Sequence, residues 1–216
     1  MDSPPEQVLV VERRLLDQCG AFQGLALDID RYLPTLLDDR HHRFIPRPAA
    51  ESDASLKQLI PYFIIVHGDR VWTYTRGKTS GEGRLVAKVS IGIGGHINPG
   101  DAGSDGGNGA YARAAARELA EEVSLPPGCA HSIVALLNDD ATPVGSVHLG
   151  VVHVLIAPSE TVRPNEAAIA EAGFKSPAEL RALRERMETW SQICFDRLDD
   201  LLRRAADSSR QVRMEI

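Results

Sequence analysis

Residues 117–122 read Arg-Glu-Leu-Ala-Glu-Glu, inside a stretch from Tyr111 to Val123 that is rich in alanine and charged residues. These residue types favour helices, and Pro126-Pro127-Gly128 follows as a strong stop. The pattern predicts a helix over 111–123. Because successive helical residues rotate by about 100°, Glu118, Glu121 and Glu122 fall on one side of that helix.

Three neighbouring carboxylates repel one another, so this helix face needs positive charge. Arg117 can pair with Glu121, four residues further on, but it cannot neutralise all three groups. A divalent cation would, and hard oxygen ligands favour Mg²⁺ or Mn²⁺. The simpler alternative is an acidic face turned to water, which is the usual place of charged clusters.

A glycine-bounded loop precedes the helix and favours the metal site over an acidic face turned to water. It reads Gly94-Gly95-His96-Ile97-Asn98-Pro99-Gly100-Asp101 and follows a predicted strand. Glycines allow backbone carbonyls and amides to approach a metal ion or a phosphate closely. The loop and the helix together therefore favour a site for a metal and a phosphorylated ligand.

These two segments resemble the box of the Nudix hydrolases, which runs Gly, five residues, Glu, seven residues, and then Arg-Glu-aliphatic-any-Glu-Glu-any-Gly-aliphatic. Gly95 and Asp101 match the first half, with Asp in place of Glu, and residues 117–125 match the second half, with Ser124 in place of Gly. The resemblance covers roughly residues 56–162.

The spacing between the two halves allows two alignments. Residues 102–116 separate them, which is fifteen positions where the family has seven. An uninterrupted spacing back from Arg117 would place Gly109 at the box Glu and Gly103 at the box Gly. The alignment with an insertion is preferred, because Gly94-Gly95 follow a strand and Asp101 keeps a carboxylate.

The resemblance implies roles for particular residues. Glu121 and Glu122 would ligate Mg²⁺, and Glu118 would be a further ligand or the base that acts on the attacking water. Arg117 would orient the carboxylates, and the carbonyl of Gly94 or Gly95 would complete the metal site.

Two further residues of the loop are included as substrate-binding candidates. His96 stands beside the glycines, where it can contact a phosphate or be an ordinary loop residue. Asp101 is shorter than the family's Glu, so we expect a weaker tether between the loop and the helix. Gly94 belongs to this substrate-binding set as well.

The rest of the chain predicts an α/β (α+β) fold. Expected strands cover residues 8–11, 58–66, 71–75, 85–93, 133–137 and 148–156; expected helices cover 26–37 (interrupted by Pro34), 164–172 and 177–204 (with Ser176 as a cap); and 38–53 is an expected loop. This order predicts a mixed β-sheet covered by helices. The resemblance implies the α/β/α sandwich of the Nudix fold, with an N-terminal arm (1–55), a hydrolase domain (56–206) and a tail (206–216).

Composition excludes several classes of protein. The 216 residues are 43% hydrophobic and 25% charged, which are ordinary globular values. The net charge of −6 argues against binding of extended nucleic acid. Cys19, Cys129 and Cys194 form no paired motif. No stretch resembles a signal peptide or a membrane span, so we expect a cytoplasmic protein.

Other polar residues are candidates with simpler alternatives. Acidic and aromatic side chains could border a pocket, and basic ones could contact phosphates, but turns, packing and solvation are the favoured explanations; they are Lys57, Trp72, Arg76, Lys78, Arg84, Asn138, Asp139, Asp140, His148, His153, Glu166, Glu171 and Trp190. His148 and His153 are expected to be core or edge residues of their strand.

The leading hypothesis is a Mg²⁺-dependent hydrolase that cleaves a diphosphate bond in a nucleoside-diphosphate-linked small molecule. The altered box keeps open a second class, a nucleotide-binding or regulatory module without catalysis. Diphosphate isomerase chemistry is a third class, but no cysteine here has a motif that supports it. The resemblance also allows a homodimer, and the sequence does not identify the substrate.

Overall fold

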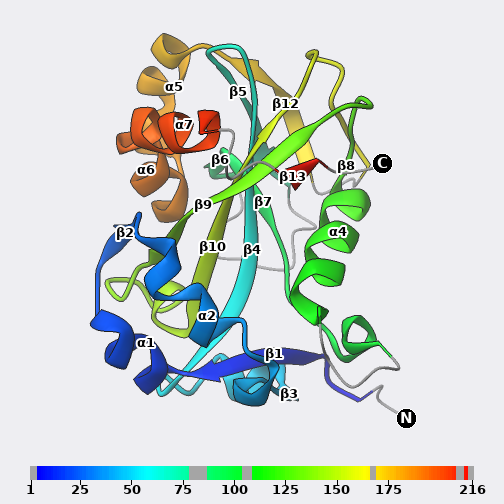
Figure 1. Cartoon of the computed structure of the whole chain (residues 1–216). Helices are drawn as coiled ribbons and strands as arrows, with labels where there is room; N and C mark the ends of the chain where they lie inside the picture. Colours follow the sequence, from blue (N-terminus) through cyan, green and yellow to red (C-terminus); the bar gives the residue numbers. More distant parts are fainter. Residues whose placement is uncertain (1–3, 78–86, 104–108, 166–168, 208–211, 214–216) are drawn as a thin grey trace. The chain divides into compact units, whose positions relative to one another are not determined.

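The computed structural model describes residues 4–77, 87–103, 109–165, 169–207 and 212–213 (Figure 1). The chain forms two compact units. The first contains Met1–Pro61, Gly94–Glu118 and Ala135–Val151, and the second contains Tyr62–Ile93, Leu119–Val134 and Val152–Ile216.

In the first unit, the N-terminal strand β1 (Gln7–Glu12) lies between two antiparallel partners. One is β3 (Arg43–Pro46) and the other is the beginning of β4 (Leu56–His67). The short strand β2 (Gly24–Ala26) pairs with the end of β9 (Ala130–Asn138). Helical segments connect these strands: α1 (Arg13–Gly20), η1 (Ile29–Arg31), α2 (Leu33–Leu36), η2 (Asp39–His41) and α3 (Arg47–Ala50).

In the second unit, the strand order is β12-β5-β4-β10-β9-β13. The new strands are β5 (Arg70–Arg76), β10 (His148–Ile156), β12 (Ile169–Lys175) and β13 (Val212–Arg213). The short strand β6 (Val89–Ser90) pairs with β5, and β7 (Gly92–Gly94) follows it. A separate antiparallel pair joins β8 (Val123–Ser124) to β11 (Arg163–Pro164).

The structure confirms the predicted α/β class with a large mixed sheet. The β4–β5 hairpin is also confirmed, with His67 opposite Arg70. Its two-residue turn needs a positive φ at the first position, which Gly68 supplies at +59°. The expected boundary of an N-terminal arm at residue 55 stays a prediction, although β1 is hydrogen-bonded to β4.

The predicted helix over 111–123 is confirmed as α4 (Ala110–Glu122), drawn in green in Figure 1. Its buried residues include Ala110 and Ala114, which are at most 2% exposed, and Leu119, which is 1% exposed. The predicted strands over 133–137 and 148–156 are confirmed as β9 and β10.

Two predictions for the C-terminal third are wrong. Residues 164–172 do not form a helix, because β11 and the first part of β12 occupy the described part of this range. Residues 177–204 form three helices and a 3₁₀ turn rather than one helix: α5 (Pro177–Leu183), η6 (Arg184–Arg186), α6 (Thr189–Asp196) and α7 (Leu198–Ala206). The predicted cap at Ser176 is confirmed, since its hydroxyl accepts from the backbone N–H of Glu179.

Predictions for the N-terminal third are only partly correct. The strand over 8–11 is confirmed within β1, but α1 directly follows it and was not predicted. The expected helix over 26–37 is reduced to η1 and α2, and the expected loop over 38–53 contains β3 and α3. The predicted strand over 85–93 appears as the short strands β6 and β7 within its described residues.

Lys57 differs most from its expected surface position, because its side chain on β4 is fully buried. Its ammonium group donates to Asp140 Oδ1 at 2.9 Å and to the carbonyl oxygen of Gly145 at 3.0 Å. Burial lowers the pKa of Lys57, and Asp140 opposes that shift. Arg13 donates two hydrogen bonds, of 2.8 and 2.6 Å, to the same carboxylate. Asp140 thus connects α1 and β4 to the segment after β9.

We expect the Asp140→Asn variant to lose about 3 kcal/mol of unfolding free energy, because the Lys57 charge stays buried without a counter-charge. Urea denaturation at pH 7 measures the loss. Asp17→Asn is the matched control, since Asp17 is an exposed partner of the same Arg13 at 3.8 Å. The control should change stability by about 0.5 kcal/mol or less. Equal losses in the two variants would contradict the role given to Asp140.

Candidate functional site

The loop between β7 and α4 folds back on itself before it reaches the helix. Pro99–Ala102 form the 3₁₀ turn η4, in which the backbone N–H of Asn98 donates to Asp101 Oδ2 at 2.8 Å. This contact orients the Asp101 carboxylate, which is 5% exposed. Residues 104–108 of the insertion lie outside the described residues.

Arg117 binds this carboxylate with both sides of its guanidinium group. Arg117 Nε donates to Asp101 Oδ1 at 2.9 Å, and Nη2 donates to Oδ2 at 2.7 Å. Such two-point pairs fix both distance and orientation. The expectation that aspartate weakens the tether is therefore wrong: η4 brings the shorter side chain within reach of the helix.

The same guanidinium group holds two further parts of the site. Nη2 also donates to the carbonyl oxygen of His96 at 3.0 Å, and Nη1 donates to Glu118 Oε1 at 2.7 Å. Hydrogen bonding to Asp101 is the largest cause that raises the pKa of Arg117. Arg117 therefore stays charged and links the loop, its backbone and the first box glutamate.

Burial by itself would raise the pKa of Asp101, because it disfavours a charged carboxylate. Hydrogen bonds from Arg117 and from the Asn98 backbone outweigh burial and lower that pKa below its ordinary value. Asp101 is therefore ionised at neutral pH.

Gly95 lies directly against the Glu118 carboxylate. A Cβ atom at residue 95 would fall 2.0 Å from Glu118 Oε2 and 2.2 Å from its Cδ, so the Glu118 carboxylate would have to move. Glycine at this position lets the carboxylate lie directly against the backbone. The structure thus brings Gly95, Asp101, Arg117 and Glu118 together, which favours the alignment with an insertion.

Arg113 adds a second contact between the helix and the loop that sequence reasoning missed. Its Nε donates to the carbonyl oxygen of Asp101 at 2.6 Å, and its Nη2 donates to that of Ala102 at 2.7 Å. The sequence offers one signal for this contact: Arg113 stands four residues before Arg117, so both arginines lie on one helix face.

Glu121 and Glu122 lie in the last turn of α4, where Glu121 is exposed and Glu122 is half-buried. Among the described residues, no group of three or more His, Cys, Asp or Glu side chains is arranged to hold a metal ion. The roles of Glu121 and Glu122 as metal ligands stay predictions.

His96 contacts a histidine that had been expected only as a core or edge residue. His96 Nε2 lies 3.4 Å from Nε2 of His148, which is 7% exposed. Nδ1 of His148 lies 2.6 Å from the carbonyl oxygen of Val144, so this nitrogen donates a proton to it. The contact places the His96 ring next to β10.

The remaining candidates fall into three groups. Trp72 and His153 are at most 2% exposed, as packing predicts. Asn138, Asp139 and Asp140 bind neighbouring protein groups, as do Arg76 and Trp190. Lys78, Arg84 and Glu166 lie outside the described residues. Gly94 lies against the backbone of Pro61. A Cβ atom added at residue 94 would fall 2.3 Å from the carbonyl oxygen of Pro61.

Among the described residues, no helix combines the length and the apolar character needed to cross a membrane.

We expect the stability contribution of Asp101 to depend on pH. The folded pKa lies below the unfolded value of about 3.9, so the contribution is complete above that value and is lost as pH falls through the folded pKa. Asp101→Asn should cost about 2 kcal/mol from pH 5 to 8, and the difference from the unmodified chain should shrink below pH 4. Urea denaturation from pH 3 to 8 measures it, with the exposed Asp28→Asn as control. A difference that grows as pH falls would contradict this account.

The chain is similar to proteins of known sequence and structure over nearly its whole length. Protein YmaB of Bacillus subtilis (strain 168) is 33% identical over 211 residues, which cover 92% of this chain and 100% of YmaB. The crystal structure of Tm1382, a candidate Nudix hydrolase, is 31% identical with a TM-score of 0.72, covering 91% of this chain and 100% of that one.

A more distant structure shares the fold alone. The Nudix domain of Shewanella oneidensis NrtR, complexed with ADP ribose, is 12% identical with a TM-score of 0.51, covering 68% of this chain and 88% of that one. No protein-family model matches the chain. The near-complete match to Tm1382, together with the contacts among Gly95, Asp101, Arg117 and Glu118, leads to one conclusion: the chain belongs to the Nudix hydrolase family.

Proposed function

We propose that this protein is a Mg²⁺- or Mn²⁺-dependent hydrolase that cleaves a diphosphate bond in a nucleoside-diphosphate-linked small molecule. One observation carries the proposal: Arg117 and Gly95 together fix the Glu118 carboxylate in one place. A carboxylate that only faced water would need neither contact.

The residues of this site suit a hard divalent cation. Glu118, Glu121 and Glu122 supply carboxylate oxygens on one face of α4, and Gly95 offers a carbonyl oxygen where no side chain can intervene. The chain places no sulfur or imidazole ligand among these four residues. When bound, the metal would neutralise charge on the diphosphate and lower the pKa of an attacking water.

The chain's own residues then have separate tasks. Arg117 holds Glu118 Oε1 at 2.7 Å, so the carboxylate stays oriented with its other oxygen against Gly95. Held in this way, Glu118 would either ligate the metal or accept the proton of the attacking water. Asp101 would fix Arg117, and the loop backbone at Gly94–His96 would border the phosphates. The ring of His96 would supply a polar contact to them.

A nucleotide-binding module without catalysis remains the second candidate. It is favoured by the lack, among the described residues, of a ready group of three metal-ligating side chains. A cytoplasmic location and a homodimer are compatible with both functions and stay predictions. Turnover of a nucleotide substrate distinguishes the two candidates.

We expect Mg²⁺-stimulated hydrolysis of at least one member of a panel of sugar nucleotides, dinucleotide polyphosphates, ADP-ribose and nucleoside triphosphates, with loss of activity in EDTA. Glu122→Gln should lower the rate at least about a hundredfold, because it removes a charged ligand, while circular dichroism stays unchanged. Glu185→Gln, at an 89% exposed side chain, is the control. Binding of a nucleotide without turnover of any panel member would favour the second candidate.

Gly95→Ala tests the close approach itself. The new Cβ atom must displace the Glu118 carboxylate, so we expect the rate to fall at least about tenfold while the chain still folds. Gly100→Ala, in the same loop, is the matched control, because a Cβ atom there meets nothing within 4 Å. Equal rates in the two variants would show that the position of Glu118 does not matter for the reaction.

A further inference from the structure

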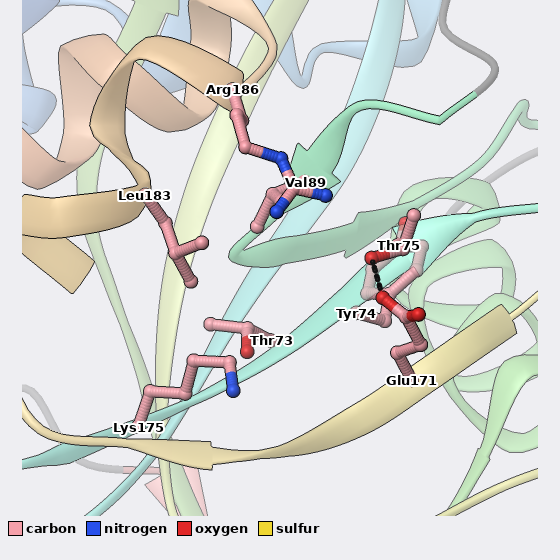
Figure 2. Close-up of a pocket in the computed structure, with 8 residues that line it drawn as sticks. All are labelled: Thr73, Tyr74, Thr75, Val89, Glu171, Lys175, Leu183 and Arg186. Atoms are coloured by element: carbon pink, nitrogen blue, oxygen red, sulfur yellow. Dashed lines mark hydrogen bonds between the residues drawn. The ribbon is translucent and has the colours of Figure 1, made fainter. Parts of the chain in front are cut away.

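A pocket in the second unit shares no residue with the site around Arg117. It lies where β5 and β12 meet the segment formed by α5 and η6 (Figure 2). Polar side chains form one part of its lining: Thr73, Thr75, Glu171, Lys175 and Arg186. Leu183 and neighbouring apolar groups form the remaining wall.

Two cations line this pocket, Lys175 and Arg186. In the described part of the chain neither side chain forms a hydrogen bond or an ion pair, although Lys175 lowers the pKa of the nearby Glu179. The adjacent Arg184, in contrast, is paired with Asp196 at 2.6 Å. Arg186 is exposed and Lys175 is half-buried, and two positive charges around one concave space attract an anion. A phosphate group, with close to two negative charges, matches them best.

The other polar groups of the pocket can only accept hydrogen bonds. Thr73 donates its hydroxyl proton to the carbonyl oxygen of Gly173 at 3.1 Å, and Thr75 donates its proton to Glu171 Oε2 at 3.0 Å (Figure 2). Each hydroxyl has one proton, so both threonine oxygens are left as acceptors, like the Glu171 carboxylate. A ligand must therefore donate hydrogen bonds to the two threonine oxygens and to the Glu171 carboxylate. Neutral hydroxyl groups can do so without adding charge.

The backbone at Glu171 supports a role for its side chain. Glu171 has a φ of +50°, in the left-handed region, where the pairing of β12 with β5 shifts register between Ala170 and Gly173. A residue with a side chain is strained there, and glycine would not be. Strained backbone positions of this kind cluster at binding sites.

We propose that this pocket binds a small sugar phosphate, with the phosphate at Lys175 and Arg186 and the sugar hydroxyls at Glu171 and the two threonine oxygens. Leu183 covers the carbon face of the sugar. The pocket's charge is positive where the phosphate lies and negative where the hydroxyls lie, so phosphate and hydroxyls are recognised separately. The proposal does not depend on the proposed hydrolase activity.

Isothermal titration calorimetry in EDTA tests the pocket with ribose 5-phosphate, inorganic phosphate and ribose as probes. EDTA removes divalent metal, so binding at the α4 carboxylates is not measured. The unmodified chain should bind ribose 5-phosphate saturably. Lys175→Met and Arg186→Gln should each weaken that binding about tenfold, since each removes a charge-assisted contact.

The Glu171→Gln variant tests the hydroxyl-binding part of the pocket separately from the phosphate-binding part. It should weaken ribose 5-phosphate binding about tenfold and leave the affinity for inorganic phosphate within about twofold. Glu171→Gly should also weaken ribose 5-phosphate binding, yet raise the midpoint of thermal unfolding because it relieves the strained φ. A purely structural glutamate would give the opposite midpoint shift, because its bond with Thr75 would be lost.

Arg181→Gln is the matched control, since Arg181 is an exposed arginine of α5 outside the pocket. It should leave all affinities unchanged. The absence of saturable ribose 5-phosphate binding would overturn the proposal, as would full binding in both Lys175→Met and Arg186→Gln. Binding of ribose, which carries no phosphate, as tight as that of ribose 5-phosphate would overturn the sugar phosphate assignment. Hydrolysis can succeed or fail in the metal-dependent assay independently of each of these results.

Discussion

The ion pair between Arg117 and Asp101 is the contact on which the candidate site depends. It closes a loop that contains a fifteen-residue segment between the two side chains, 102–116. Closing a longer loop costs only slightly more entropy, so a single two-point ion pair, supported by Arg113, can hold it. The same guanidinium group then sets the position of Glu118, and Gly95 sets the space that Glu118 occupies.

Among the described residues, the buried charged groups have partners from distant parts of the chain. Lys57 is satisfied by Asp140, 83 residues away. Glu188, which is 5% exposed, accepts from Ser90 at 2.6 Å and from Arg76 at 3.0 Å. Such contacts make a misplaced strand costly, because a buried charge would lose its partner.

The pocket beside β12 differs from these buried sites, because Glu171 and Arg186 are exposed and Lys175 is half-buried. Its two cations form no hydrogen bond or ion pair among the described residues, while its carboxylate lies on a strained backbone. Buried polar groups, in contrast, are satisfied within the fold. Polar and charged groups that line a concave surface and keep hydrogen-bonding capacity can bind a ligand there. Family membership fixes the fold around both sites but not the molecules that they bind.

The sequence by itself determined α4 and the β4–β5 hairpin, because these depend on local residue patterns, and it favoured the alignment that pairs Gly95 and Asp101 with the box helix. Only the tertiary structure decided that residues 169–175 form a strand, since their alanine and glutamate favour a helix and pairing with β5 outweighs that preference. It also decided that Lys57 is buried and that Arg113 holds the loop. Helical hydrogen bonds join residues four apart, whereas the partners of strands and buried charges lie far away in the chain.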